Sequence, residues 1–136
     1  MTSQSVNLLF RDIRGQIFLQ FRDANAIVEP FCWSFWGGRV EPYEKDDLRR
    51  AACREAGEEL GLALAPEDFE FVHERQGSDG KRSTLLTCQR AISWNDVTIA
   101  EGAGGGFFPR ESLSSLNLHK RLRYYCEEEN WVFTKT

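Results

Sequence analysis

Short apolar runs in the first part of the chain carry the alternating pattern of β-strands. Residues 5–10 and 16–22 form two such runs around Gly15, and every second residue of the later run is hydrophobic. Because strand side chains point alternately to opposite faces of a sheet, the two runs predict a β-hairpin. A loop over 24–32 and a short aromatic strand over 33–36, ended by a Gly-Gly pair, are expected to follow.

After residue 46 the hydrophobic spacing changes to that of a helix. Small or apolar residues recur at every fourth position and form one stripe, namely Leu48, Ala52, Ala56 and Leu60. The helical pattern begins at Asp46 or Asp47, Asp46 is the expected N-cap, and Gly61 is expected to end the helix. The pattern therefore predicts a helix that buries one side against the rest of the domain.

The remaining chain alternates again and then returns to helical spacing. Strands are expected at 69–73 and 83–92, and a glycine-rich loop at 101–106. A short helix is expected after Pro109 and a last helix at 117–128. The order of strands, helix, strands and helix is typical of an α/β fold with helices on both faces of a mixed central sheet. The length suits a single domain over residues 1–136.

Charge and cysteine usage narrow the class of function. The formal net charge is -4 and the pI about 5.3, which argues against a general nucleic-acid or membrane binder and leaves room for a small phosphorylated substrate. The four cysteines form no C-x-x-C pair, so free thiols in the cytoplasm are expected rather than a zinc site. The first residues lack the pattern of a signal peptide, and no apolar run is long enough to span a bilayer. A monomer or a homodimer is expected.

Three carboxylates stand out on the predicted helix. Glu55, Glu58 and Glu59 follow the spacing i, i+3, i+4, which places them on one helical face. Such a cluster is either a solvated surface, where Arg54 pairs with Glu58, or a site for a divalent cation. Mg²⁺ prefers oxygen ligands and often binds carboxylates together with substrate phosphates. Spacing alone leaves both interpretations open.

The stretch GGRVEPYEKDDLRRAACREAGEELGL, residues 37–62, resembles the signature box of the Nudix hydrolase superfamily. That box reads G-x5-E-x7-R-E-U-x-E-E-x-G-U, where U is a bulky aliphatic residue. The matching positions are Gly38, Glu44, Arg54, Glu55, Glu58, Glu59, Gly61 and Leu62. Nine residues instead of seven separate Glu44 from Arg54, so either Glu44 or Asp46 takes the place of the first box glutamate. Ala56 is smaller than the aliphatic residue of the pattern.

The resemblance implies a Nudix-type α/β/α sandwich that hydrolyses a phosphoanhydride bond in a nucleoside diphosphate linked to another moiety, with Mg²⁺ as cofactor and Mn²⁺ as a substitute. It implies metal ligation by Glu55, Glu58 and Glu59, completed by the carbonyl of Gly38, with Arg54 holding a glutamate in place. Glu101, which opens the glycine-rich loop, is expected to be a further ligand. The general base is Glu55, Glu58 or Glu101, and the sequence does not decide among them.

Other residues are candidates for contacts with a small nucleotide substrate. Arg22, at the end of the second strand, either faces phosphates or is simply exposed, and Arg39 is a weaker candidate. Phe35 or Phe107 could stack on a base. Loose similarity to small bacterial family members points towards a nucleoside triphosphate. The rival interpretation is a non-catalytic nucleotide-binding module, but such domains usually lose one of the box acids and this chain keeps them all.

Overall fold

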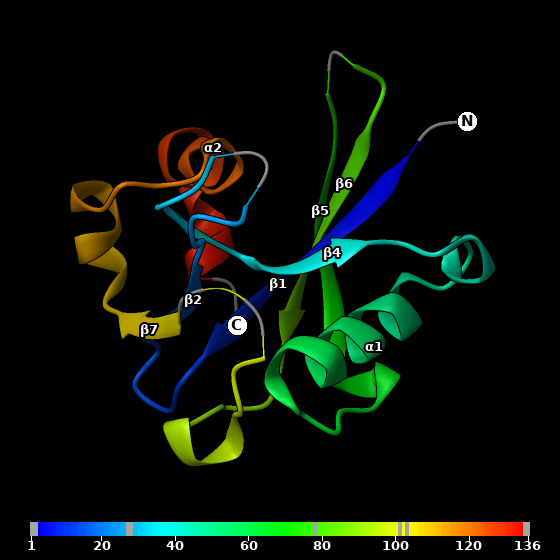
Figure 1. Ribbon diagram of the computed structural model, residues 1–136, viewed down its shortest axis with the longest axis horizontal. Coiled ribbons are helices and arrows are strands. Elements are labelled where there is room, and N and C mark those ends of the chain that lie inside the picture. The colour runs from blue at the N-terminus through cyan, green and yellow to red at the C-terminus, as the bar shows by residue number, and fades with distance from the viewer. Residues whose placement is uncertain (1–2, 27–28, 78, 101, 103, 135–136) are drawn as a thin grey trace.

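A computed structural model describes residues 3–26, 29–77, 79–100, 102 and 104–134 (Figure 1). Its strands are β1 (Gln4–Arg11), β2 (Ile17–Phe21), β3 (Trp33–Ser34), β4 (Trp36–Arg39), β5 (Phe69–Gln76), β6 (Arg82–Cys88) and β7 (Gly104–Phe108). The α-helices are α1 (Leu48–Leu60) and α2 (Lys120–Glu128). No helix among the described residues is long and apolar enough to cross a membrane.

Strand β1 is the centre of the sheet. It pairs in parallel with β6 and antiparallel with β2 and β4, while β2 also pairs with β3 and β7, and β6 with β5. The first half of β1 pairs with β4 and its last two residues pair with β2, so the sheet divides along this strand. The predicted α/β fold with a mixed sheet is thereby confirmed.

Two hydrophobic cores lie on opposite faces of the sheet, because successive side chains of β1 point to opposite sides. Val6, Leu8 and Phe10 pack towards α1, and Leu9 packs towards α2. Figure 1 shows α1 and α2 on different sides of the sheet. The helices therefore cover both faces, as the order of elements predicted.

Helix α1 ends at Gly61 as predicted, but its N-cap is Asp47 instead of the expected Asp46, and Leu48 of the predicted stripe is only partly buried. The side chain of Asp47 caps the first turn by accepting a hydrogen bond from the backbone of Arg50 at 3.2 Å. Gly61 ends the helix in the left-handed conformation, with φ of 66°. The fully buried stripe consists of Ala51, Ala52, Ala56 and Leu60. Small side chains along this stripe let the helix lie close to β1 and β4.

Two predictions about glycines were wrong. Gly37 and Gly38 do not end a strand but lie within β4, where they pair with Asn7 and Val6 of β1. Gly37 has φ of 123°, and a Cβ at this position would lie 2.1 Å from the carbonyl oxygen of Val6. Residues 104–106 belong to β7 instead of a loop, since glycine lets this strand pass close to the aromatic rings below it.

The other predicted boundaries need smaller corrections. The strand expected over 83–92 ends at Cys88, and the strand expected over 69–73 continues to Gln76. The last helix begins at Lys120, three residues after the expected start at 117. The four cysteines are free thiols, as expected.

Candidate functional site

Arg54 is the centre of an ion-pair network on the exposed side of α1. Its Nε donates to Glu44 Oε2 at 2.8 Å and its Nη2 donates to Glu44 Oε1 at 2.9 Å. Its Nη1 donates to Glu55 Oε1 at 3.2 Å and to Glu58 Oε2 at 3.1 Å. The hydrogen bonds with Glu44 raise the pKa of Arg54, so the guanidinium remains charged throughout the usual pH range.

Glu44, rather than Asp46, takes the place of the first box glutamate. The side chain of Glu44 is 1% exposed and accepts hydrogen bonds from Nε and Nη2 of Arg54, whereas Asp46 is exposed. Glu44 Oε1 also accepts the backbone N–H of Glu41 at 3.0 Å. The hydrogen bond from Arg54 lowers the pKa of Glu44 despite its burial. The longer loop is thus accommodated between Glu44 and the helix, and the contact with Arg54 is preserved.

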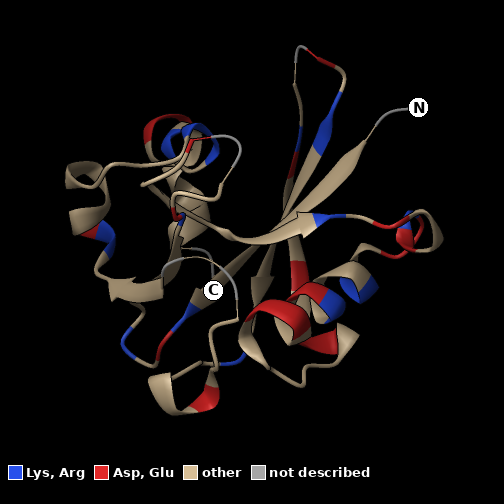
Figure 2. Ribbon diagram, in the orientation of Figure 1, with Lys and Arg blue, Asp and Glu red and all other residues tan. Residues whose placement is uncertain are grey.

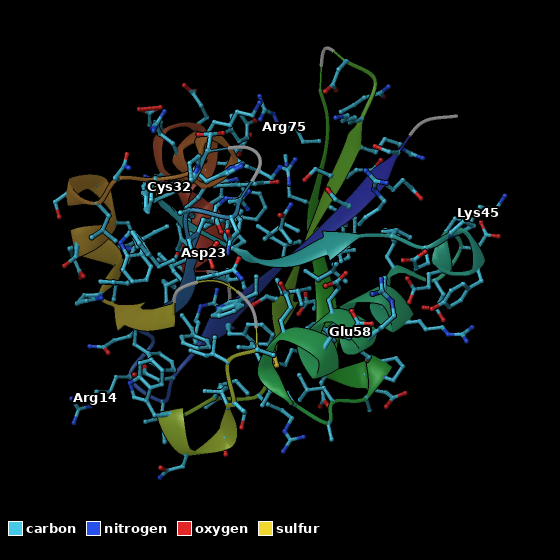
Figure 3. All side chains as sticks on the ribbon, viewed as in Figure 1. Arg14, Asp23, Cys32, Lys45, Glu58 and Arg75 are labelled. Carbon is cyan, nitrogen blue, oxygen red and sulfur yellow. The ribbon has the colours of Figure 1, made fainter. Side chains whose placement is uncertain are left out.

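The three helix carboxylates differ in burial. Glu55 and Glu59 are 8% and 3% exposed and lie against β4, while the side chain of Glu58 is 61% exposed (Figure 3). Glu59 Oε1 accepts the backbone N–H of Gly37 at 2.8 Å. A Cβ at Gly38 would lie 2.7 Å from Glu55 Oε1, so only glycine lets this carboxylate approach the strand so closely.

The donor set suits a hard divalent cation, because it consists of carboxylate oxygens. Among the described residues, no three Asp, Glu, His or Cys side chains converge closely enough to hold a metal ion. Arg54 Nη1 contacts both Glu55 and Glu58 and supplies the positive charge between them. The carboxylates fit Mg²⁺ by their chemistry.

A hollow of about 520 Å³ opens beside Glu59, the most buried of the three helix carboxylates. It is lined by Arg22 at the end of β2, by Gly37 and Glu59, and by Ala100 and Gly102 of the segment before β7. Ala100 is anchored there because its N–H donates to the carbonyl of Glu59 at 2.9 Å. Glu101, the expected additional ligand, lies outside the described residues.

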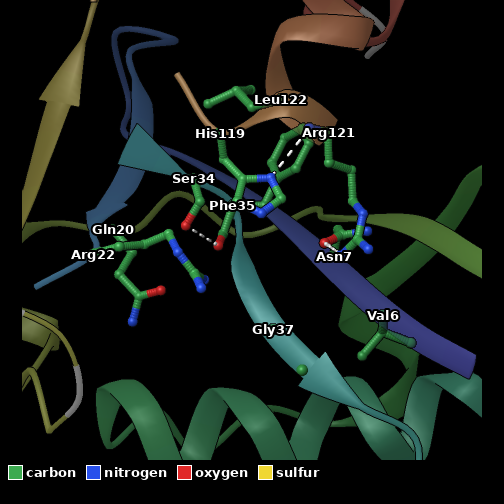
Figure 4. A pocket seen from close by; sticks show the side chains of 11 residues that line it. Val6, Asn7, Gln20, Arg22, Ser34, Phe35, Gly37, His119, Arg121 and Leu122 are labelled. Carbon is green, nitrogen blue, oxygen red and sulfur yellow. Dashed lines mark hydrogen bonds between the residues drawn. The ribbon is translucent and has the colours of Figure 1, made fainter. Parts of the chain in front are cut away.

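A smaller cavity of about 130 Å³ adjoins the hollow, and both are lined by Gln20, Arg22 and Gly37. Figure 4 shows Arg22 and Arg121 entering from opposite sides, with His119 between them. Asn7 and Arg121 are in contact, at 3.4 Å between Oδ1 and Nη1. The lining is therefore polar and basic, although the cavity lies between two hydrophobic cores.

His119 lines the cavity in its neutral form. Burial lowers its pKa to about 4, even though Glu29 Oε2 lies 3.5 Å from its Nε2. Its Nδ1 accepts the backbone N–H of Arg121 at 3.1 Å, which places the ring proton on Nε2. The imidazole thus caps α2 and presents no charge of its own at neutral pH.

Three of these residues were missed at the level of sequence. Asn7, His119 and Arg121 come from β1 and from the start of α2, more than 100 positions apart. One signal was available, since Asn7 is a polar residue within the apolar run SVNLLF. A polar side chain in a strand that is buried on both faces requires a partner or a ligand.

The remaining predicted contact residues are placed less favourably. Phe35 lines the small cavity, but its ring packs against Tyr125 and Phe133, which leaves little free face for a base. Phe107 stacks on Phe18 with ring centroids 4.4 Å apart. Arg39 is exposed at the end of β4, and its carbonyl accepts a hydrogen bond from Arg54 at 3.0 Å.

Comparisons with known proteins agree with this architecture. The NUDIX domain family matches residues 1–113. A MutT structure from work on the Aliivibrio salmonicida and Vibrio cholerae proteins is 18% identical with a TM-score of 0.78, and covers 100% of each chain. MutT from Methanosarcina mazei is 22% identical with a TM-score of 0.74, over 98% of this chain and 96% of that chain. A comparison with curated proteins finds no significant match.

A third similar fold is the Nudix domain of NrtR from Shewanella oneidensis, solved with ADP ribose. It is 13% identical with a TM-score of 0.72, over 97% of this chain and 88% of that chain. Fold and family together define a hydrolase of the Nudix type. The chain belongs to the NUDIX domain family.

Proposed function

We propose that this protein hydrolyses a phosphoanhydride bond in a nucleoside diphosphate linked to another moiety, in a reaction that depends on Mg²⁺. The observation that carries this proposal is the position of the α1 carboxylates. Glu55 and Glu59 are fixed against β4, Glu58 is exposed beside them, and Glu59 lines the same hollow as Arg22. Acidic residues for a cation thus lie opposite a basic residue for phosphates.

In this proposal Glu55, Glu58 and Glu59 hold the metal, and the carbonyl of Gly38 and Glu101 are further candidates. Bound Mg²⁺ would neutralise phosphate oxygens and lower the pKa of a water molecule. Glu58 can rotate to such an ion because its side chain is mostly exposed. Mn²⁺ is expected to substitute, since it accepts the same oxygen ligands.

The protein residues have distinct tasks in the reaction. Arg54 keeps Glu55 oriented through its Nη1 while Glu44 fixes the guanidinium from the other side. One carboxylate, Glu55, Glu58 or Glu101, takes a proton from the attacking water as general base. Arg22 binds a phosphate oxygen and orients the chain of phosphates for attack. The leaving phosphate takes the electron pair of the broken P–O bond.

The substrate is a small nucleotide, with a nucleoside triphosphate as the first candidate. The small polar cavity beyond Arg22 is the candidate position for the nucleoside, because it adjoins the hollow at Glu59 and shares lining residues with it. The similar NrtR domain was solved with ADP ribose, a nucleoside diphosphate linked to a sugar. That complex supports a ligand of this general class.

The test is turnover of a nucleotide panel. Pure protein is incubated with Mg²⁺ or Mn²⁺ and with nucleoside triphosphates, nucleotide sugars and dinucleotides, and the release of phosphate, pyrophosphate or nucleotide is followed. Metal-dependent cleavage of at least one compound is expected. Binding without turnover, independent of metal, would instead favour the non-catalytic nucleotide-binding module.

A further inference from the structure

A groove of about 450 Å³ lies between the β5–β6 hairpin and α2, remote from the α1 carboxylates. Its basic lining residues come from both elements and are Arg75, Lys81, Lys120, Arg121 and Arg123. Figure 2 shows basic residues on the hairpin and on α2, where they face the groove together with a smaller number of acidic residues. In a protein of net charge -4, this local excess of cations calls for an explanation.

Among the described residues, three cations of the groove, Arg75, Lys120 and Arg121, are held without a direct ion pair, although Asp79 lines the same groove. The guanidinium of Arg75 lies 3.6 Å from the centre of the Tyr124 ring, reaching from β5 towards α2 (Figure 3). Within the described parts of the chain, Arg75, Lys120 and Arg121 make no ion pair within 4.0 Å. Unpaired positive charges held close together are favourable only when an anion is bound.

Arg121 is the most constrained of these cations. Burial lowers its pKa, and the neighbouring positive charges of Arg22 and Arg75 lower it further. The only hydrogen bond described for its guanidinium is the long one to Asn7, at 3.4 Å. A half-buried arginine with several free N–H donors is well suited to a phosphate, which accepts two parallel hydrogen bonds from it.

Arg121 also connects the groove to the proposed active site. It lines both the groove and the small cavity, and Arg22 lines both the small cavity and the hollow at Glu59. The three spaces therefore adjoin one another, with an arginine at each boundary. The groove thus lies next to the cavity that adjoins the proposed active site.

We propose that the groove binds a second phosphate group of the substrate, on the side of the nucleoside remote from the scissile anhydride. The substrate class is then a nucleotide with a phosphate on its ribose in addition to the anhydride-linked chain. This inference rests on the proposed function. Arg75 and Lys120 bind the remote phosphate from the two walls, and Arg121 contacts it from the cavity side.

A single phosphate suits the groove better than a nucleic-acid strand. Three carboxylates, those of Asp79, Glu127 and Glu128, also line it. Lys81 is already near one of them, at 3.9 Å from Asp79. A longer polyanion would have to pass these acids, whereas one phosphate can remain among the cations of the groove.

The test compares ligands that differ only in the remote phosphate. Binding of adenosine and guanosine 5′-monophosphates and of the matching 3′,5′- and 2′,5′-bisphosphates is measured by calorimetry with Mg²⁺ present. A bisphosphate should bind at least about tenfold more tightly than the monophosphate, as expected for new charge-assisted contacts. Arg75→Ala and Lys120→Ala should each remove most of this gain. Arg82→Ala is the matched control, because Arg82 is on the same hairpin, pairs with Glu74 and does not line the groove.

These binding measurements test the phosphate site in the groove independently of the proposed hydrolysis. Equal affinity for monophosphates and bisphosphates would overturn the inference, even if the nucleotide panel is hydrolysed. An Arg75-dependent gain without any turnover would support the groove while the proposed hydrolysis fails. Affinity for RNA oligonucleotides that rises steadily with their length, and exceeds that for the bisphosphates, would also overturn the assignment to a single phosphate.

Discussion

Arg54 holds Glu44 by two hydrogen bonds of 2.8 and 2.9 Å, and the same guanidinium contacts Glu55 and Glu58. One arginine thus joins the loop before α1 to two carboxylates of the proposed metal site. Because Glu44 is 1% exposed, its charge depends on this partner. Two functions follow for the pair, stability of the loop and orientation of Glu55.

The substitution Glu44→Gln tests the stabilising part of this relationship. It removes the buried negative charge and leaves Arg54 without its main partner, which should lower the free energy of unfolding by roughly 3 kcal/mol. The measurement is urea denaturation followed by circular dichroism. Asp46→Asn is the matched control and should change stability by less than about 0.5 kcal/mol, because Asp46 is exposed. Equal effects of the two variants would contradict the assignment of Glu44.

The neighbouring glycines of β4 should respond differently to alanine. Gly37→Ala places a Cβ 2.1 Å from the Val6 carbonyl at a positive φ, so a loss of at least about 2 kcal/mol in stability is expected. At Gly38 the obstructing atoms belong to the Glu55 carboxylate, which can move aside. Gly38→Ala should therefore leave the thermal unfolding temperature nearly unchanged while metal-dependent turnover falls about tenfold or more. Similar unfolding temperatures for both variants would argue against this difference.

Stability should depend on pH through His119. The pKa of this residue is about 4 in the folded protein and 6.5 in its ordinary state, so the unfolded chain binds the proton first as the pH falls. The contribution of neutral His119 to the free energy of unfolding is complete above pH 6.5, and it is lost progressively as the pH falls from 6.5 to about 4. Unfolding temperatures measured across this window should fall less steeply for His119→Gln. Parallel curves for the two proteins would show that another group is responsible.

Arg22 is predicted to bind substrate phosphates, and Arg39 at the end of β4 provides a comparison. Arg22 lines the hollow beside Glu59, whereas Arg39 is exposed and lines neither the hollow nor the small cavity. Arg22→Ala should lower kcat/KM by about tenfold to a hundredfold, because one charge-assisted contact to phosphate is lost. Arg39→Ala should change it less than about threefold. The measurement is steady-state kinetics with a nucleotide that the protein hydrolyses. A larger loss of kcat/KM for Arg39→Ala than for Arg22→Ala would contradict the assignment of Arg22 as the phosphate-binding residue.

Local patterns predicted helix α1 well, apart from the N-cap, which is Asp47 instead of Asp46. Asp47 caps it, Ala52, Ala56 and Leu60 form its buried stripe, and Gly61 ends it. The glycines of β4 were misinterpreted because a Gly-Gly pair usually indicates a turn, and only pairing with β1 makes it part of a strand. Long-range pairing of this kind leaves no local trace in the sequence.

The candidate site was predictable where its residues share one segment and unpredictable where they do not. Glu55, Glu58 and Glu59 follow a helical spacing, so their proximity is a local property. Asn7 and Arg121 meet only because β1 and α2 pack together in the folded chain. The choice between Glu44 and Asp46 likewise depends on which carboxylate Arg54 reaches, and this is set by the path of the loop.

The central claim is that the α1 carboxylates drive metal-dependent hydrolysis, and Glu58→Gln tests it most directly. Glu58 is largely exposed, so the fold and the unfolding temperature should be preserved. Turnover of the best nucleotide of the panel should fall by at least about 100-fold at saturating Mg²⁺, because a ligand or base is lost. Glu67→Gln, a neutralised and exposed carboxylate beyond the end of α1, should retain full activity. Near-normal Mg²⁺-dependent turnover by Glu58→Gln would contradict the account.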